Sequence, residues 1–216
     1  MLLKRTRDRK EKTPPCRIFL TRSQWLQQIA WDDLDNKSLR YKLTPLAFLF
    51  MFQTGLRIGE VCAVRYEDIE GDVIHLQRSI ERDCHRIKDG LKGVNTERWV
   101  PLSDEAKRII EEARKRQKAM GVSDSGYVFS TDDNYLSYRS LSSAFVRYCE
   151  KAGIEYRSSH KARKTFISTL IDAGMNINTI REWVGHAEEQ TTWGSYCYDR
   201  RTNDERKEIL ESALSS

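Results

Sequence analysis

Two short β-rich segments interrupt a sequence that otherwise follows a helical period, and this pattern limits the possible folds most. The segments are Val73–Gln77 and Arg98–Leu102, and a polar stretch from 81 to 97 with two glycines separates them. Short extended segments joined in this way predict a small antiparallel sheet with a mobile hairpin. Helical patterns on both sides indicate an α+β chain that is mainly helical.

Apolar spacing and end signals predict where the helices lie. The expected helices are one capped by Thr21, and then 39–53, 58–64, 103–120, 141–151, 160–173, 178–184, 191–198 and 203–214. The 39–53 segment is dense in apolar residues, so we expect it at the centre of the core. Pro45 either begins this helix in its first turn or kinks it. Gly55 is expected to end it.

The charge balance suits a polyanionic partner. The chain has 216 residues and a net charge of +5, which is compatible with nucleic-acid binding without requiring it. Six basic residues stand among the first twelve: Lys4, Arg5, Arg7, Arg9, Lys10 and Lys12. We interpret residues 1–20 as a basic tail or linker, either solvated or contacting phosphates. Residues 21–216 are expected to form one domain.

Composition argues against several classes of protein. The five cysteines are odd in number, widely spaced and without a CxxC pair, which disfavours a disulfide framework and a structural zinc site. The longest apolar run, Leu46–Phe52, is far below the roughly 20 residues of a membrane span. No apolar segment follows the basic start, so no secretory signal is predicted. A cytoplasmic protein without membrane association is expected.

A set of polar residues spread over the chain suggests phosphate chemistry. They are Arg57, His160, Arg163, His186 and Tyr196. Attack on a phosphodiester builds negative charge on its oxygens, and fixed positive donors stabilise that charge. Arginine suits this task because its planar fork donates two parallel hydrogen bonds. The i, i+3 spacing of His160 and Arg163 places both on one face of a helix.

Four short motifs around these residues resemble those of the tyrosine recombinase (phage integrase) family. They are Thr54–Glu60 (TGLRIGE), His160–Arg163 with Ala162 where leucine is usual, Val184–His186 (VGH), and Thr191–Tyr196. The resemblance runs from about Thr21 to the end of the chain. It implies the catalytic-domain fold of that family.

The resemblance also implies a role for each residue. Tyr196 would attack the phosphorus and form a 3′-phosphotyrosine, which stores the bond energy for rejoining. Arg57 and Arg163 would clamp the phosphate. His160 would exchange a proton with the tyrosine, and His186 would steady the transition state. No metal or other cofactor is implied.

Two assignments remain open between neighbouring residues. The family places a lysine in the hairpin as general acid, and Lys92 lies at about the usual distance before the Arg98 strand, with Lys88 as the alternative. Tyr196 lies ten residues after His186, close to the family's spacing, whereas Tyr198 lies twelve after it. We therefore favour Lys92 and Tyr196.

The resemblance implies double-stranded DNA as partner and a homotetramer on paired DNA sites, with a monomer possible when DNA is absent. Family members usually have an N-terminal DNA-clamping domain, which we expect to be absent from this chain. The last predicted helix has an apolar stripe of Ile209, Leu210 and Leu214. This stripe would dock on a neighbouring protomer or pack on its own domain.

Three other functions are considered. The same residues would serve strand relaxation, as in type IB topoisomerases. A regulator that binds DNA without cutting it would keep the scaffold alone. A metal-dependent nuclease would use acidic residues such as Glu60, Glu67, Asp68 and Asp72, but their arrangement lacks the paired character of a two-metal site.

Overall fold

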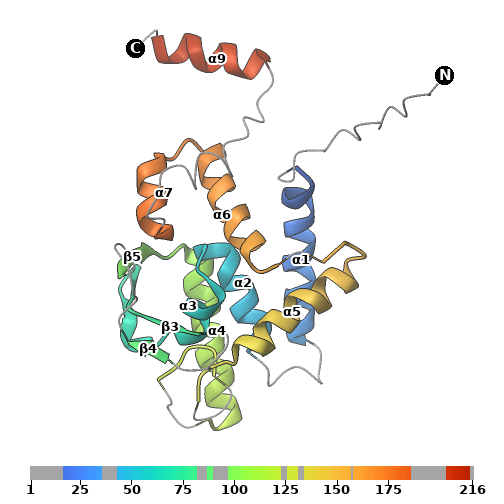
Figure 1. Cartoon of the computed structure of the whole chain (residues 1–216), viewed down its shortest axis with the longest axis vertical. Helices are drawn as coiled ribbons and strands as arrows, with labels where there is room; N and C mark the ends of the chain where they lie inside the picture. The colour runs from blue at the N-terminus through green and yellow to red at the C-terminus, as the bar shows by residue number, and fades with distance from the viewer. Residues whose placement is uncertain are drawn as a thin grey trace, which may run out of the picture.

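The computed structural model describes residues 17–35, 43–81, 87–89, 97–122, 126–130, 134–156, 158–185 and 203–214. The helices are α1 Arg17–Asp35, α2 Thr44–Thr54, α3 Ile58–Ala63, the 3-10 helix η1 Tyr66–Asp68, α4 Asp104–Met120, α5 Tyr138–Lys151, α6 His160–Asp172, α7 Ile177–Val184 and α9 Asn203–Leu214. The strands are β1 Ile69–Glu70, β2 Val73–Leu76, β3 Arg78–Ile80, β4 Ile87–Asp89 and β5 Arg98–Pro101. The strands lie to one side of the helices (Figure 1), which confirms the expected mainly helical α+β class.

Helix α2 lies at the centre of the packing. Every residue of α2 except Gln53 is buried, because the segment is apolar on all sides and no face of it suits water. Helices α1, α4, α5 and α6 all pack against it. The core position expected for this segment is therefore confirmed. Among the described residues, no helix is both long and apolar enough to cross a bilayer.

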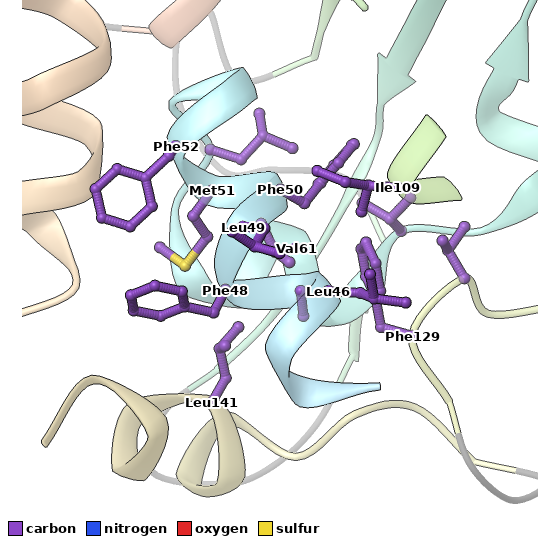
Figure 2. Close-up of a cluster of buried hydrophobic side chains, with 14 of the residues drawn as sticks. Leu46, Phe48, Leu49, Phe50, Met51, Phe52, Val61, Ile109, Phe129 and Leu141 are labelled. Atoms are coloured by element: carbon purple, nitrogen blue, oxygen red, sulfur yellow. The ribbon is translucent and has the colours of Figure 1, made fainter. Parts of the chain in front are cut away.

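Aromatic side chains fix how α2 meets its neighbours. The Phe48 ring lies 4.5 Å from the Phe145 ring and 4.7 Å from the Tyr148 ring, both on α5. On another side of α2, the Phe50 ring lies 5.3 Å from the Phe129 ring, as Figure 2 allows the reader to follow. Tilted and edge-on ring pairs at these distances are favourable. They hold α5 and the 126–130 segment against α2.

The starts of α1 and α2 both differ from the starts of the predicted helical segments. Helix α1 begins at Arg17, so Thr21 lies inside the helix and the predicted cap is wrong. Helix α2 begins at Thr44, with Pro45 in its first turn. Proline fits there because the first-turn N–H groups have no partner within a helix. This is the first of the two alternatives for Pro45.

Serine side chains set the starts of α4 and α5. Ser103 Oγ accepts a hydrogen bond from the Ala106 N–H, as predicted for the start of α4. Ser137 Oγ accepts from the Ser140 N–H, so α5 begins three residues before the predicted Leu141. The predicted start lay too far along the chain because apolar spacing gives no sign of a polar first turn. The N-cap serine stabilises that turn.

The strands form two small antiparallel sheets. Strands β1, β2 and β5 lie in the order β1-β2-β5. Ile74 pairs with Val100 and both are buried, whereas His75 and Trp99 stack on the opposite face with 4.2 Å between ring centroids. Strands β3 and β4 pair only with each other in the described residues. The polar stretch predicted as a hairpin connection thus contains a strand of its own.

Two glycines permit close approaches around α2 and α3. Gly55 ends α2 with a φ of +64°, and a Cβ there would lie 2.4 Å from Cδ1 of Phe166 on α6. A Cβ on Gly59 of α3 would lie 2.4 Å from the Ile80 carbonyl oxygen of β3. A Cβ at either distance would force its neighbour to shift, so both contacts favour glycine.

Replacing Gly55 by alanine tests the first of these approaches. We expect Gly55→Ala to lower the free energy of unfolding by about 3 kcal/mol, of which about 1 comes from the left-handed φ and about 2 from the clash with Phe166. Urea unfolding followed by circular dichroism measures the change.

Gly121 offers a matched control for this measurement. It ends α4 with a φ of +65°, and a Cβ there would meet nothing within 4 Å. Gly121→Ala should therefore lose only the backbone contribution of about 1 kcal/mol. Equal losses in the two variants would contradict a close approach of α2 to α6.

Candidate active site

Arg57 lies in the connection between α2 and α3 with its guanidinium partly in solvent. Its side chain is 47% exposed and makes an ion pair with Glu60 at 2.9 Å. A second guanidinium N–H donates to the Gly185 carbonyl oxygen at 3.1 Å. A guanidinium has five N–H donors, so, among the described residues, further donors remain for an anion. The Arg57 side chain is therefore fixed by its bonds to Glu60 and Gly185, while part of the guanidinium remains accessible to solvent.

Glu60 holds Arg57 in this position. It is the third residue of α3, and its Oε2 accepts a hydrogen bond from the Arg57 backbone N–H at 2.7 Å while Oε1 accepts from the guanidinium. Its side chain is 2% exposed. Burial alone would raise the pKa of Glu60, but the hydrogen bond and charge of Arg98 and the charges of Arg57 and Arg163 lower it. Glu60 is therefore an anion at neutral pH.

Arg98 is a second partner of the same carboxylate. It is the first residue of β5, and its side chain is 6% exposed. Nη2 donates to Glu60 Oε2 at 2.9 Å, and Nε donates to the Trp183 carbonyl oxygen at 2.6 Å. The side chain thus connects the sheet to both α3 and α7.

Arg163 lies deeper than its predicted role suggested. It is 1% exposed on α6. Nη1 donates to the Gly55 carbonyl oxygen at 2.9 Å, and Nη2 donates to the Val184 carbonyl oxygen. These contacts join the end of α2, the first turn of α6 and the end of α7. Contact between Arg163 and a phosphate stays a prediction.

Three arginines from separate elements therefore converge on the end of α7. Their acceptors are successive carbonyls: Trp183 for Arg98, Val184 for Arg163 and Gly185 for Arg57. The last carbonyls of a helix lack partners within it and have partial negative charge, so cations stabilise them. With one carboxylate against three guanidinium groups, this cluster also keeps excess positive charge.

His160 is the first residue of α6, one turn before Arg163, so the structure brings this predicted pair together. Partial burial of the ring lowers the pKa of His160, and the nearby positive charges of Arg163, Lys164, Arg57 and Lys161 lower it further. The imidazole is therefore neutral at pH 7. A neutral ring can accept a proton.

The other predicted site residues lie outside the described part of the chain. They are Lys92, His186 and Tyr196, and the alternative Tyr198 lies outside it as well. His186 directly follows Gly185, the last residue of the carbonyl series. The backbone of Lys88, the alternative general acid, lies in β4 opposite Ser79 of β3. The choice between Lys92 and Lys88 stays open.

The acidic residues considered for a metal-dependent nuclease are paired with basic side chains. Glu60 pairs with Arg57 and Arg98, and Glu67 and Asp68 both pair with Arg78. Asp72 pairs with Lys107. Across the described ranges, no group of three His, Cys, Asp or Glu side chains has a metal-binding arrangement.

The sequence contained signals for Glu60 and Arg98 that the site prediction did not use. Glu60 stands three residues after Arg57 at a helix start, the spacing of a capping box. Arg98 shares the alternation of Val100 and Leu102 in a β-rich segment, and alternate residues of a strand point to the same face. A charged residue on the buried face of a strand needs a partner.

Removing the negative charge of Glu60 tests the arginine cluster. At pH 7 we expect Glu60→Gln to lower the free energy of unfolding by about 3–5 kcal/mol, as for other broken buried pairs. Because the folded-state pKa lies below the ordinary 4.5, the stabilisation is complete above that value and is lost as pH falls through the folded pKa. Urea unfolding of both proteins between pH 7 and pH 3 should therefore show the difference shrinking with acid.

Glu105 provides the control for the Glu60 variant. It makes an ion pair with Arg108 at 2.9 Å, but both side chains are exposed enough to be screened by water. Glu105→Gln should change the free energy of unfolding by less than about 1 kcal/mol across the same pH range. A Glu60→Gln difference that grows with acid would contradict the lowered pKa.

Several curated relatives resemble this chain in sequence. A XerC-like tyrosine recombinase of Caldanaerobacter subterraneus subsp. tengcongensis is 28% identical over 173 residues, which cover 70% of this chain and 44% of the relative. Transposase A of transposon Tn554 from Staphylococcus aureus is 30% identical over 179 residues, which cover 79% of this chain and 48% of the relative. The chain thus spans about half the length of these relatives.

Solved structures share its fold. The Tn1549 transposon integrase in complex with transposon right end DNA matches with a TM-score of 0.71 at 19% identity, over 91% of this chain and 65% of that one. The XerA recombinase matches with a TM-score of 0.61 at 17% identity, over 88% of this chain and 63% of that one. These likenesses confirm the predicted catalytic-domain fold.

The family model described as "Phage integrase family" matches residues 19–202. This range includes all four motifs on which the sequence resemblance depended. It also includes the arginines that meet at the end of α7. The chain belongs to the phage integrase family.

Proposed function

We propose that this chain is the catalytic domain of a site-specific recombinase that cuts and rejoins double-stranded DNA through a 3′-phosphotyrosine. The observation that supports this most is the arginine cluster at the end of α7, where Arg57 is both anchored by Glu60 and half exposed. An anchored guanidinium with donors toward solvent suits a phosphodiester, because it needs little reorganisation when the anion gains charge. Membership of the phage integrase family supports the same chemistry.

The proposed reaction conserves the phosphodiester energy. The Tyr196 oxygen bonds to phosphorus as the bond from phosphorus to the 5′-oxygen breaks. His160 takes the tyrosine proton, and Lys92, or Lys88 in its place, gives a proton to the leaving 5′-oxygen. Arg57, Arg163 and His186 stabilise the charge on the phosphoryl oxygens. Reversal of these steps with a new 5′-hydroxyl rejoins the strand without ATP or metal.

We propose the assembly from the same family relation. Recombination between two DNA sites would require a homotetramer, with a monomer possible when DNA is absent. Ile209, Leu210 and Leu214 of α9 are exposed in this structure, which supports docking on a neighbouring protomer, the first of the two alternatives for this stripe. A DNA substrate also agrees with the cytoplasmic location expected from the sequence.

Covalent trapping tests the proposed chemistry. The protein would be incubated in EDTA with nicked duplexes tiled across the DNA on either side of its own gene, then run on a denaturing gel. A nick beside the cleavage point releases a short fragment and prevents rejoining, so the adduct accumulates. We expect an adduct that Tyr196→Phe abolishes, because phenylalanine has no oxygen to attack the phosphorus.

Tyr198→Phe is the matched control, and the adduct should persist in it. Loss of the adduct in Tyr198→Phe alone would identify Tyr198 as the nucleophile in place of Tyr196. Relaxation of supercoiled plasmids without any specific site would favour the topoisomerase alternative. Binding to DNA without an adduct from any duplex would favour the regulator.

The acid side of the cleavage rate tests His160. Its pKa lies below the ordinary 6.5, so the native single-turnover rate should stay level down to that pH and fall only in more acidic buffer, where the ring becomes protonated. His160→Ala should cleave about 100-fold more slowly and lose this acid inflection. His75→Ala is the control, because His75 stacks on Trp99 on the outer face of the sheet. It should keep both the rate and the inflection.

A further inference from the structure

We propose that Arg98 is a positioning residue for DNA cleavage, acting through Glu60 on Arg57 and through the Trp183 carbonyl on the segment that leads to His186. This inference rests on the proposed function of the chain. The sequence motifs did not include Arg98. Its importance follows from the bonds that one buried side chain makes to two parts of the site.

The contacts of Arg98 indicate that its action is indirect. Its side chain is only 6% exposed, and its charge is paired with the buried Glu60 carboxylate, to which Nη2 donates at 2.9 Å. A buried charge persists only where partners replace its lost hydration. Those partners include Glu60 and the end of α7, and both belong to the proposed site.

The first route of action runs through the shared carboxylate. Glu60 Oε2 accepts from Arg98 at 2.9 Å, and Glu60 Oε1 accepts from the Arg57 guanidinium at 2.9 Å. Arg98 is the first of the charged groups that lower the pKa of Glu60. Without Arg98, the buried carboxylate would be held mainly by the half-exposed Arg57, and the position of Arg57 would become less defined.

The second route runs through the end of α7. Strand β5 packs against α7 (Figure 1), and the bond from Arg98 Nε to the Trp183 carbonyl measures 2.6 Å. Arg163 and Arg57 bind the next two carbonyls. Together the three bonds hold the end of α7 and Gly185, the residue that precedes His186 in the sequence. A displacement of about 1 Å at a reacting group is enough to slow a reaction about 100-fold.

The forked shape of arginine is needed for both routes. Nε and Nη2 of one planar group reach Trp183 and Glu60 at the same time. A lysine at this position would keep the positive charge beside Glu60, but its single ammonium group cannot reproduce the fixed two-pronged geometry. Arg98→Lys therefore separates charge from geometry. Arg98→Gln removes the charge as well.

The test uses the full chain and the nicked duplex that gives most covalent adduct. The single-turnover rate constant of adduct formation is measured at saturating protein, and duplex affinity is measured separately in a Tyr196→Phe background. We expect Arg98→Lys to lower the rate constant about 100-fold with unchanged duplex affinity. Arg98→Gln should lower the rate constant at least as much.

The form of the loss distinguishes positioning from simple unfolding. Partial unfolding lowers the amount of adduct formed, whereas a misplaced site lowers the rate constant of the folded molecules. A double-mutant cycle adds a second criterion, because residues that act through one another have non-additive effects. In an Arg57→Ala background, Arg98→Lys should slow cleavage much less than it does in the native chain.

Arg116 supplies a matched control. It also bridges a carboxylate and a backbone carbonyl, with Nε donating to Glu112 at 2.6 Å and Nη1 donating to the Leu34 carbonyl at 3.1 Å. It lies on α4, and the two groups it bridges belong to α4 and α1, outside the arginine cluster. Arg116→Lys should leave the rate constant unchanged.

The outcomes separate this inference from the proposed function. An unchanged rate constant in both Arg98 variants, or a loss confined to adduct yield, would overturn the positioning role while the recombinase chemistry stands. Full additivity with Arg57→Ala would overturn the route through Glu60. Absence of any adduct from the native protein would overturn the proposed function, and this inference with it.

Discussion

The buried carboxylate of Glu60 is the interaction on which the rest of the site depends. It accepts hydrogen bonds from the Arg57 backbone, the Arg57 guanidinium and Arg98. Without an anion at this point, three guanidinium groups would repel one another in a region where water screens poorly. With it, the cluster keeps a net positive charge that is fixed in place. A phosphate site needs both properties.

The packing around α2 creates the conditions for that cluster. Gly55 ends α2 and lets α6 approach so closely that any side chain would meet Phe166. The same approach brings Arg163 of α6 within 2.9 Å of the Gly55 carbonyl. On the other side, Gly59 lets α3 lie against β3. Close contacts between helices and strands thus position the arginines. The apolar core around α2 fixes the elements that carry them.

Local patterns predicted many elements because their causes are local. The apolar segment of α2 could only be buried. Ser103 marks the start of α4 through its side-chain oxygen and Gly121 marks its end through its backbone N–H. Thr21 misled because α1 begins at Arg17, so a residue type that is common at helix starts lies here within the helix. Strand β4 was missed because its short sequence has no alternation of its own, and it is stabilised by pairing with β3 and by packing of Ile87 against the core.

The sequence by itself determined the α+β class, the central helix, the motifs of the phage integrase family and the choice of Arg57, His160 and Arg163 as site residues. Only the tertiary structure showed that Arg163 is buried against backbone carbonyls and that Arg98 joins Glu60 to α7. The reason is sequence separation. Arg98 lies 38 residues from Glu60 and 85 from Trp183, and no local spacing rule relates residues that meet only when the chain has folded.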